Sequence, residues 1–136
     1  MYLVLQWPQS NKIPRLTGRK KGVLTLSISA DTLRGHTDTI ILAQLMEGDS
    51  YGYQINKTIQ EKTNDQYGFK EATLYTAFRR MEQSGLITSY WGEDSPGARR
   101  RYYAITEEGR RQWADNCRAW QDTRALIDSL IAYKED

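Results

Sequence analysis

The chain has 136 residues, 39% of them hydrophobic and 26% charged, which is the balance of one folded domain rather than of a disordered chain. No apolar run approaches the ~20 residues that a membrane-spanning helix needs. A single cysteine, Cys117, and a single histidine, His36, form neither an intrachain disulfide nor a set of metal ligands, so we expect no metal, no cofactor and a reducing, cytoplasmic compartment.

Residues 1–30 differ in charge from the rest of the chain. They carry five of the 19 basic residues and no acidic residue, whereas residues 31–136 carry 14 basic and 17 acidic residues. Two interpretations of this N-terminal extension stay open: a flexible basic arm that touches DNA, or a non-native start. We slightly favour the second interpretation. Lys21-Gly22-Val23 is what a translated ribosome-binding site could encode, and Leu26 shortly after it would then correspond to an unusual start codon.

Three helices are predicted after residue 31, each from apolar residues that recur at helical spacing. The first follows the cap Thr37-Asp38 and ends before Gly48, and the second follows the cap Asp49-Ser50 and runs to about residue 63. Residues 64–69 form a loop, and the third helix covers about 71–84.

The hydrophobic period then changes to that of strands. Strands at 86–91 and 100–105 enclose a loop at 92–97, in which Pro96-Gly97 suits a type II turn. Thr106 caps a final helix that no proline interrupts up to Tyr133, a length of ~40 Å. A helix of this length cannot pack only against its own small domain, so a second copy of the chain is the simplest partner.

This order of elements predicts a mainly α fold with a small β-hairpin. We expect a winged helix-turn-helix over residues 31–105 that binds DNA, followed by a long C-terminal dimerisation helix over residues 106–136.

The third predicted helix has one apolar stripe, which we expect to be buried: Leu74, Ala77, Phe78 and Met81. Its opposite face offers small residues, hydroxyls and arginines that suit base edges and phosphates. Such a face alone is as readily an ordinary solvated surface, but the preceding helix and the basic hairpin favour DNA. The candidate DNA-binding residues are Tyr53, Lys70, Ala72, Thr73, Tyr75, Thr76, Arg79, Arg80, Arg99, Arg100 and Arg101.

The three hairpin arginines are the densest charge in the folded region. In a strand, Arg99 and Arg101 share one face and Arg100 takes the other. Because adjacent like charges repel, we expect an anionic partner, the phosphate backbone, to neutralise them. The alternative is pairing with Glu93 and Asp94 across the turn, as weak surface salt bridges.

One face of the final helix is apolar at steps of about seven residues. This stripe predicts a dimer interface of Trp113, Cys117, Trp120, Ile127, Leu130 and Ile131. Two-fold symmetry could also bring two copies of Trp120 together around a slot for a small aromatic effector. Ordinary dimer packing is the alternative.

From Asp31 onward the chain resembles the PadR family of bacterial transcriptional regulators, because several motifs occur in order at fitting spacings. The matching stretches are Leu33-Arg34-Gly35-His36-Thr37-Asp38, Tyr51-Gly52-Tyr53-Gln54-Ile55, Thr73-Leu74-Tyr75, Gly85-Leu86-Ile87, Arg99–Tyr103 and Ile105-Thr106-Glu107-Glu108-Gly109.

A single helix after the wing is similar to the short subfamily. The resemblance implies a homodimer that binds double-stranded DNA at a pseudo-palindromic operator, usually as a repressor, and that in some members releases DNA when an aromatic compound stacks on a terminal-helix tryptophan. Trp120 matches that position best, and Trp113 less well. The sequence departs from the family at Glu93-Asp94, where the wing tip is often more basic, and at Thr76, where proline is common.

An enzyme is disfavoured, because the sequence has no Cys/His pair, Gly-rich phosphate loop or glycine-flanked serine nucleophile. The main rival to a DNA-binding regulator is a winged-helix module for protein–protein interaction, whose basic wing would meet an acidic partner. A steep loss of DNA affinity with salt would favour the regulator.

Overall fold

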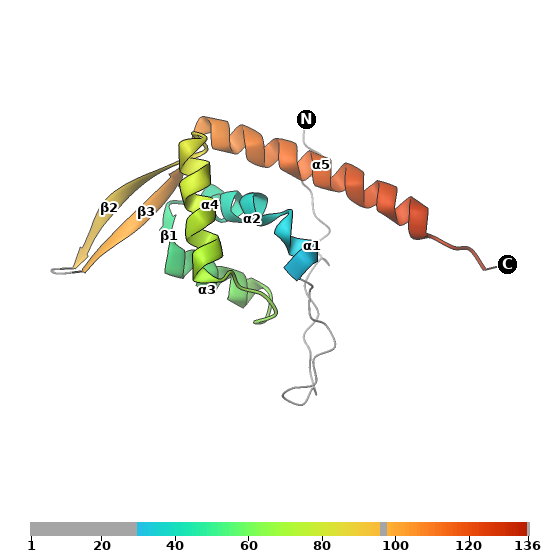
Figure 1. Ribbon diagram of the computed structural model, residues 1–136, viewed down its shortest axis with the longest axis horizontal. Helices are drawn as coiled ribbons and strands as arrows, with labels where there is room; N and C mark the ends of the chain where they lie inside the picture. Colours follow the sequence, from blue (N-terminus) through green and yellow to red (C-terminus); the bar gives the residue numbers. More distant parts are fainter. Residues whose placement is uncertain (1–29, 96–97, 136) are drawn as a thin grey trace, which may run out of the picture.

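The computed structural model describes residues 30–95 and 98–135. β3 lies between β1 and β2 and is antiparallel to both, and the β2–β3 hairpin and α5 project to opposite sides of α4 (Figure 1). This mainly helical architecture with a small sheet and a long last helix confirms the predicted fold class. In chain order the elements are α1 (Ala30–Arg34), α2 (Thr37–Met46), β1 (Ser50–Tyr51), α3 (Gly52–Lys62), α4 (Glu71–Gln83), β2 (Ile87–Ser95), β3 (Ala98–Ile105) and α5 (Glu107–Ile131).

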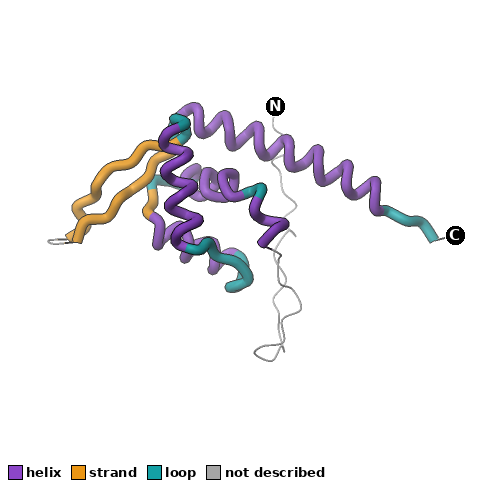
Figure 2. The backbone as a smooth tube through the Cα atoms, viewed as in Figure 1, coloured by secondary structure: helices purple, strands orange, loops and turns teal. Residues whose placement is uncertain are grey.

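The hydrophobic core lies where α2, α3 and α4 meet the base of the sheet (Figure 2). Phe78 of α4 stacks on Tyr103 of β3, with ring centroids 4.0 Å apart. The predicted buried stripe of the third helix is confirmed, because all four of its members are at most 2% exposed. The core consists of Ile41, Leu42, Leu45, Ile55, Ile59, Phe69, Leu74, Ala77, Phe78, Met81, Ile87 and Tyr103.

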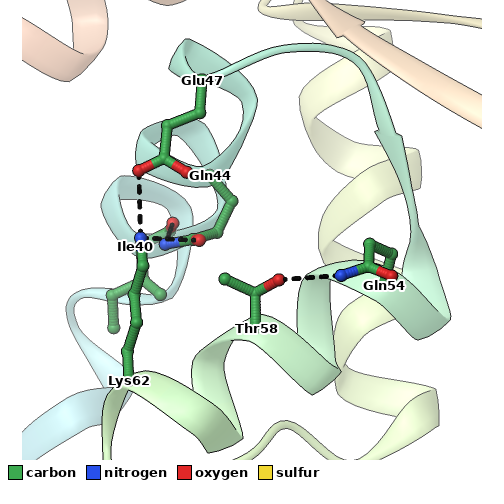
Figure 3. Close-up of polar contacts among 6 residues, drawn as sticks. All are labelled: Ile40, Gln44, Glu47, Gln54, Thr58 and Lys62. Carbon is green, nitrogen blue, oxygen red and sulfur yellow. Dashed lines mark hydrogen bonds and ion pairs between the residues drawn. The ribbon is translucent and has the colours of Figure 1, made fainter.

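A polar contact on the surface joins the ends of α2 and α3 (Figure 3). Lys62 Nζ donates to Oε1 of Gln44 at 3.3 Å and lies 3.1 Å from Oε1 of Glu47. Within α3, the Gln54 amide donates to the hydroxyl of Thr58 at 3.1 Å. Exposed ion pairs of this kind contribute about 0–1 kcal/mol, so the apolar core supplies most of the stability of this helix pair.

The predicted cap of the second helix is wrong. Ser50 and Tyr51 form strand β1, which pairs with Tyr103 and Tyr102 of β3. Tyr51 has φ −130° and ψ 164°, and α3 begins only at Gly52. The edge of β3 offers backbone hydrogen bonds that satisfy this segment, so an extended conformation replaces the expected helical cap.

The hairpin is longer than predicted. Residues 92–95, expected in a loop, belong to β2, which runs to Ser95 and has an irregularity in register between Glu93 and Ser95. Gly92 lies beneath the ring of Tyr102, and a Cβ atom there would be 2.4 Å from that ring. This glycine therefore permits close packing in a strand rather than ending it. The predicted turn at 96–97 lies outside the described residues.

The last helix begins as predicted. The Thr106 hydroxyl accepts a hydrogen bond from the Gly109 backbone N–H at 3.0 Å and donates to the carbonyl of Gly85 at 2.7 Å. The cap therefore fixes the start of α5 to the segment between α4 and β2. The helix ends at Ile131, two residues before the predicted limit.

The short helix α1 was not predicted. Its five residues include an ion pair between Asp31 and Arg34, with N and O atoms 2.8 Å apart. Both interpretations of the N-terminal extension concern residues that, apart from Ala30, lie outside the described part of the chain.

Candidate nucleic-acid interface

The solvent-facing side of α4 carries the residues predicted to read DNA. The helix follows Lys70, whose backbone is extended, and its first turn presents the small side chains of Ala72 and Thr73. Small residues at a helix start allow the backbone to approach base edges in a major groove. Every candidate from this segment is exposed: Lys70, Ala72, Thr73, Tyr75, Thr76, Arg79 and Arg80.

The turn before α4 is held by side-chain hydrogen bonds. The Asn56 side chain donates to the carbonyl of Phe69 at 2.9 Å and accepts from its N–H at 2.7 Å. Asn64 and Asp65 adopt positive φ values of 51° and 62°, a conformation that these two residue types tolerate better than most. These contacts fix the angle between α3 and α4, and thus where α4 presents its exposed face.

Two neighbouring arginines of α4 have different environments. Arg80 forms a bidentate ion pair with Asp38 of α2, with N–O distances of 2.6 and 2.7 Å. This hydrogen bond to Asp38 raises the pKa of the Arg80 guanidinium. Arg79 is exposed on the same helix. Sequence reasoning grouped the two arginines because no local signal relates Asp38 to a residue 42 positions later.

The β2–β3 hairpin is the predicted wing, and on one of its faces two arginines lie over a single indole ring. The guanidinium carbon of Arg99 lies 5.1 Å from the centroid of the Trp91 ring, and that of Arg101 lies 5.3 Å away. Arg101 also donates to the Ser89 hydroxyl at 2.8 Å and lies 4.0 Å from a carboxylate oxygen of Glu82 on α4. The carboxylate described beside Arg101 thus belongs to Glu82 of α4, the helix predicted to read DNA, and not to the wing tip.

The opposite face of the wing pairs its arginine with tyrosines. The guanidinium of Arg100 lies 4.7 Å from the ring centroid of Tyr51, whose ring contacts Tyr102 edge-on. Tyr90 stacks on Tyr102 and donates through its hydroxyl to Asp49 at 2.7 Å. The predicted division of the arginines between two faces is therefore observed, and aromatic rings support both faces.

A small groove of about 330 Å³ separates α3 from α4. Tyr53, 70% exposed, and Tyr75, 41% exposed, line it. The groove is also lined by Lys57, which sequence reasoning missed, although it lies four residues after Tyr53 and hence on the same helical face. The groove therefore combines two tyrosine hydroxyls and a lysine with the carboxylate of Glu71.

The predicted dimer stripe on α5 has two different environments. Trp113 packs against the core of its own domain, and Cys117 is half-buried, which raises the pKa of its thiol. At the other end, Ile127, Leu130 and Ile131 are 45%, 73% and 75% exposed. The stripe thus stabilises the domain at its start and lies in solvent at its end.

Trp120 lies between these two regions. The edge of its ring meets His36, with centroids 4.7 Å apart, at the start of α2. It lines an open groove of about 1350 Å³ between α2, α4 and α5, to which Thr73 and Thr76 of the reading helix also contribute. The groove therefore joins the candidate effector residue to the candidate DNA-reading face. Trp113, the second candidate for an effector, packs instead on the core.

Residues 30–95 and 98–135 lack the features of two other classes of site. These residues contain no group of three or more His, Cys, Asp or Glu side chains placed to hold a metal. No helix in the same ranges combines the length and apolarity needed to cross a membrane.

Sequence comparison finds a family and a relative. Residues 41–115 match the model of the transcriptional regulator PadR-like family. An uncharacterized protein of Lysinibacillus sphaericus is 40% identical over 104 residues, which are 76% of this chain and 95% of that protein.

Solved structures agree with this match. A transcriptional regulator from Clostridium thermocellum is 48% identical, with a TM-score of 0.71 over 77% of this chain and 99% of that chain. A PadR family transcription regulator from Clostridium difficile is 34% identical, with a TM-score of 0.63 over 72% of this chain and 100% of that chain. The candidate interface thus lies on a fold that this chain shares with proteins described as transcriptional regulators.

Proposed function

Because the chain belongs to the PadR-like family of transcriptional regulators, we propose that it is a homodimeric repressor of a pseudo-palindromic operator. Family membership confirms that the chain is a DNA-binding regulator and not an enzyme, and it disfavours the rival interpretation as a protein–protein interaction module. The proposal also places the protein in the cytoplasm, where bacterial chromosomal DNA lies.

The observation that carries the dimer is the exposed apolar end of α5. Leu126, Ile127, Leu130 and Ile131 are each at least 45% exposed, and they follow one another on adjacent turns. Burying apolar surface yields about 25 cal/mol per Å², so a second copy of the same helix would gain by covering them. A two-fold dimer also supplies two reading helices, as a pseudo-palindromic site requires.

The contacts divide by environment. Thr73, Thr76 and Arg79 are exposed on α4 and suit base edges, whereas Arg99 and Arg100 on the wing suit phosphates. Tyr53 on α3, Lys70 just before α4 and Tyr75 on α4 would contact the sugar–phosphate backbone, and Ala72 allows close approach. Arg101, exposed on the wing 4.0 Å from a carboxylate oxygen of Glu82, would also contact phosphates, whereas Arg80, in an ion pair with Asp38, would act first by fixing α4.

A planar aromatic effector would act at Trp120. Its half-buried ring lines the groove that extends to Thr73 and Thr76, so a ligand stacked there would lie beside the reading helix. Release of DNA requires that the effector bind the DNA-free arrangement more tightly, because equal affinity for both arrangements shifts nothing.

Sequencing the DNA fragments retained by the pure full-length protein tests the proposal. We expect an inverted repeat whose half-sites lie about one helical turn, ~34 Å, or a multiple of it apart. Transcription in vitro from a promoter that contains this repeat should fall when the protein is added. Retained fragments without a repeat would contradict the dimeric operator, and increased transcription would contradict repression.

A further inference from the structure

We propose that Trp91 is a positioning residue for DNA binding, whose indole ring orders the guanidinium groups of Arg99 and Arg101 before they meet the phosphate backbone. The proposal rests on the proposed function, in which wing arginines contact DNA. Trp91 itself is 51% exposed, so its ring does not serve mainly to fill the core.

The register of the hairpin brings the three side chains together. Trp91 of β2 lies directly opposite Arg101 of β3, and Arg99 lies two pairs further toward the tip, opposite Glu93. Side chains two residues apart share one face of a strand, so Arg99 and Arg101 both reach the same ring. Their guanidinium carbons are 5.1 and 5.3 Å from the ring centroid, within the ~6 Å at which an indole face attracts a cation.

The Trp91 ring offsets two free-energy costs: repulsion between Arg99 and Arg101, and the loss of their rotamer freedom on binding. Two guanidinium groups on one strand face repel each other, and the electron-rich indole face offsets part of this repulsion. Free arginine side chains also have many rotamers, which they lose when they bind. Arg101 is additionally held by Ser89 and Glu82, whereas the contact described for Arg99 is that with Trp91. Arg99 should therefore depend most on the ring.

Ordering in the free protein lowers the cost of ordering in the complex. Immobilising one such side chain on binding raises the dissociation constant by about two- to tenfold. Loss of the ring should cost this factor without changing the number of phosphates neutralised. The slope of log affinity against log salt should therefore stay the same, whereas removal of an arginine should lower it by about one.

The test uses the full-length protein and a fluorescein-labelled duplex of random sequence, with anisotropy measured at several salt concentrations. Trp91→Leu should weaken binding about two- to tenfold at an unchanged salt slope, and Trp91→Phe, which keeps an aromatic face, should recover most of the loss. In an Arg99→Ala background, Trp91→Leu should have little further effect. Tyr90→Leu is the matched control, because Tyr90 is the preceding residue of β2 and stacks on Tyr102; its effect should add to that of Arg99→Ala.

Equal losses from Trp91→Leu in both backgrounds, or equal losses from the Leu and Phe variants, would overturn the positioning role. If Arg99→Ala and Arg101→Ala weaken binding and Trp91→Leu does not, the positioning role fails alone. If both arginine variants bind with unchanged affinity and slope, the DNA contact that the proposed function gives to this face of the wing fails, and the role of Trp91 fails with it. Thermal unfolding of each variant checks that the fold is intact.

Discussion

The two halves of α5 have similar apolar patterns and opposite surroundings. The first half packs on its own domain through Trp113 and Ala114, which is 9% exposed. The second half presents Leu126, Leu130 and Ile131 at 60%, 73% and 75% exposure. A helical stripe therefore has two uses along one helix: the part that contacts its own core stabilises the monomer, and the part that extends beyond it is available to another molecule.

The same distinction separates the neighbouring arginines of α4. Arg80 has its carboxylate partner, Asp38, within the chain, and Arg79 is exposed beside it. A residue whose partner lies within the chain should affect mainly stability when changed, and a residue exposed toward a partner should affect mainly binding.

Of the changes that distinguish the two halves of α5, Ile127→Glu should have the largest effect. A carboxylate in the dimer interface would lose its hydration without gaining a partner, so the dimer should dissociate. Operator affinity should then fall by about 10²–10⁴, because the two half-sites can no longer be bound as one unit. Analytical ultracentrifugation and anisotropy measure the two effects.

Ser129→Glu is the matched control for this change. Ser129 is exposed on the same turns of α5, and its hydroxyl bonds to the carbonyl of Leu126, on a face away from the apolar stripe. This variant should remain a dimer with normal affinity. Dissociation of both variants, or of neither at micromolar concentration, would contradict the assignment of the interface.

Trp113→Ala should act on the other half of the helix. Removing a partly buried tryptophan from the core should lower the free energy of unfolding by about 3 kcal/mol, near the lower end of the range for such truncations. Urea unfolding at a fixed protein concentration measures this loss. Sedimentation of the folded variant should still give a dimer, and a stable but monomeric variant would show that Trp113 belongs to the interface instead.

Arg79→Ala and Arg80→Ala should differ in kind. If Arg79 contacts a guanine, its loss should cost about 1–3 kcal/mol on the operator and much less on random DNA. Arg80→Ala breaks an exposed ion pair and should lower stability by about 1 kcal/mol or less. Anisotropy on both duplexes, with thermal unfolding, measures the two effects. An equal loss on every sequence for Arg79→Ala would indicate a phosphate contact.

Trp120→Ala changes the residue that lies between the two halves of α5, and its effect on operator binding should be smaller. Planar cationic dyes and phenolic acids should quench tryptophan fluorescence and weaken operator binding, and the variant should lose both responses while remaining a dimer. The stacking contribution is about 0.5–1.5 kcal/mol per aromatic pair beyond area burial. Quenching that survives in Trp120→Ala would place the ligand elsewhere, and quenching without weaker DNA binding would exclude a switch.

Local signals were enough to predict most of the fold. Spacing alone identified the buried stripe of α4, and a threonine followed by two acidic residues identified the start of α5. The strand at Ser50–Tyr51 could not be predicted this way, because its partners on β3, Tyr103 and Tyr102, lie 53 and 51 residues later in the chain. The sequence places Gly92 in a loop, since it does not reveal the Tyr102 ring that packs over this glycine.

Which residues are charged and exposed at the site was predictable, but their partners were not. Arg80 and Arg101 are among the predicted DNA-binding residues because arginines near a DNA-reading helix favour phosphates. Their contacts with Asp38 and Glu82 depend on how helices and strands pack, and helical or strand periodicity carries no information on such distant pairs. Lys57 was overlooked for the opposite reason: a lone surface lysine has no pattern until α4 lies beside it.

The junction at the start of α5 has a mechanical consequence. A Cβ atom at Gly109 would lie 2.1 Å from the carbonyl oxygen of Leu86, and the Thr106 hydroxyl bonds to the same segment, so the helix cannot pivot freely on the domain. With 25 residues, α5 is a lever of about 37 Å. A tilt of about 5° at this junction moves the far end by roughly 3 Å, about the rise of one base pair. In the proposed dimer, the angle at this junction would therefore set the distance at which two copies of the domain meet the same duplex.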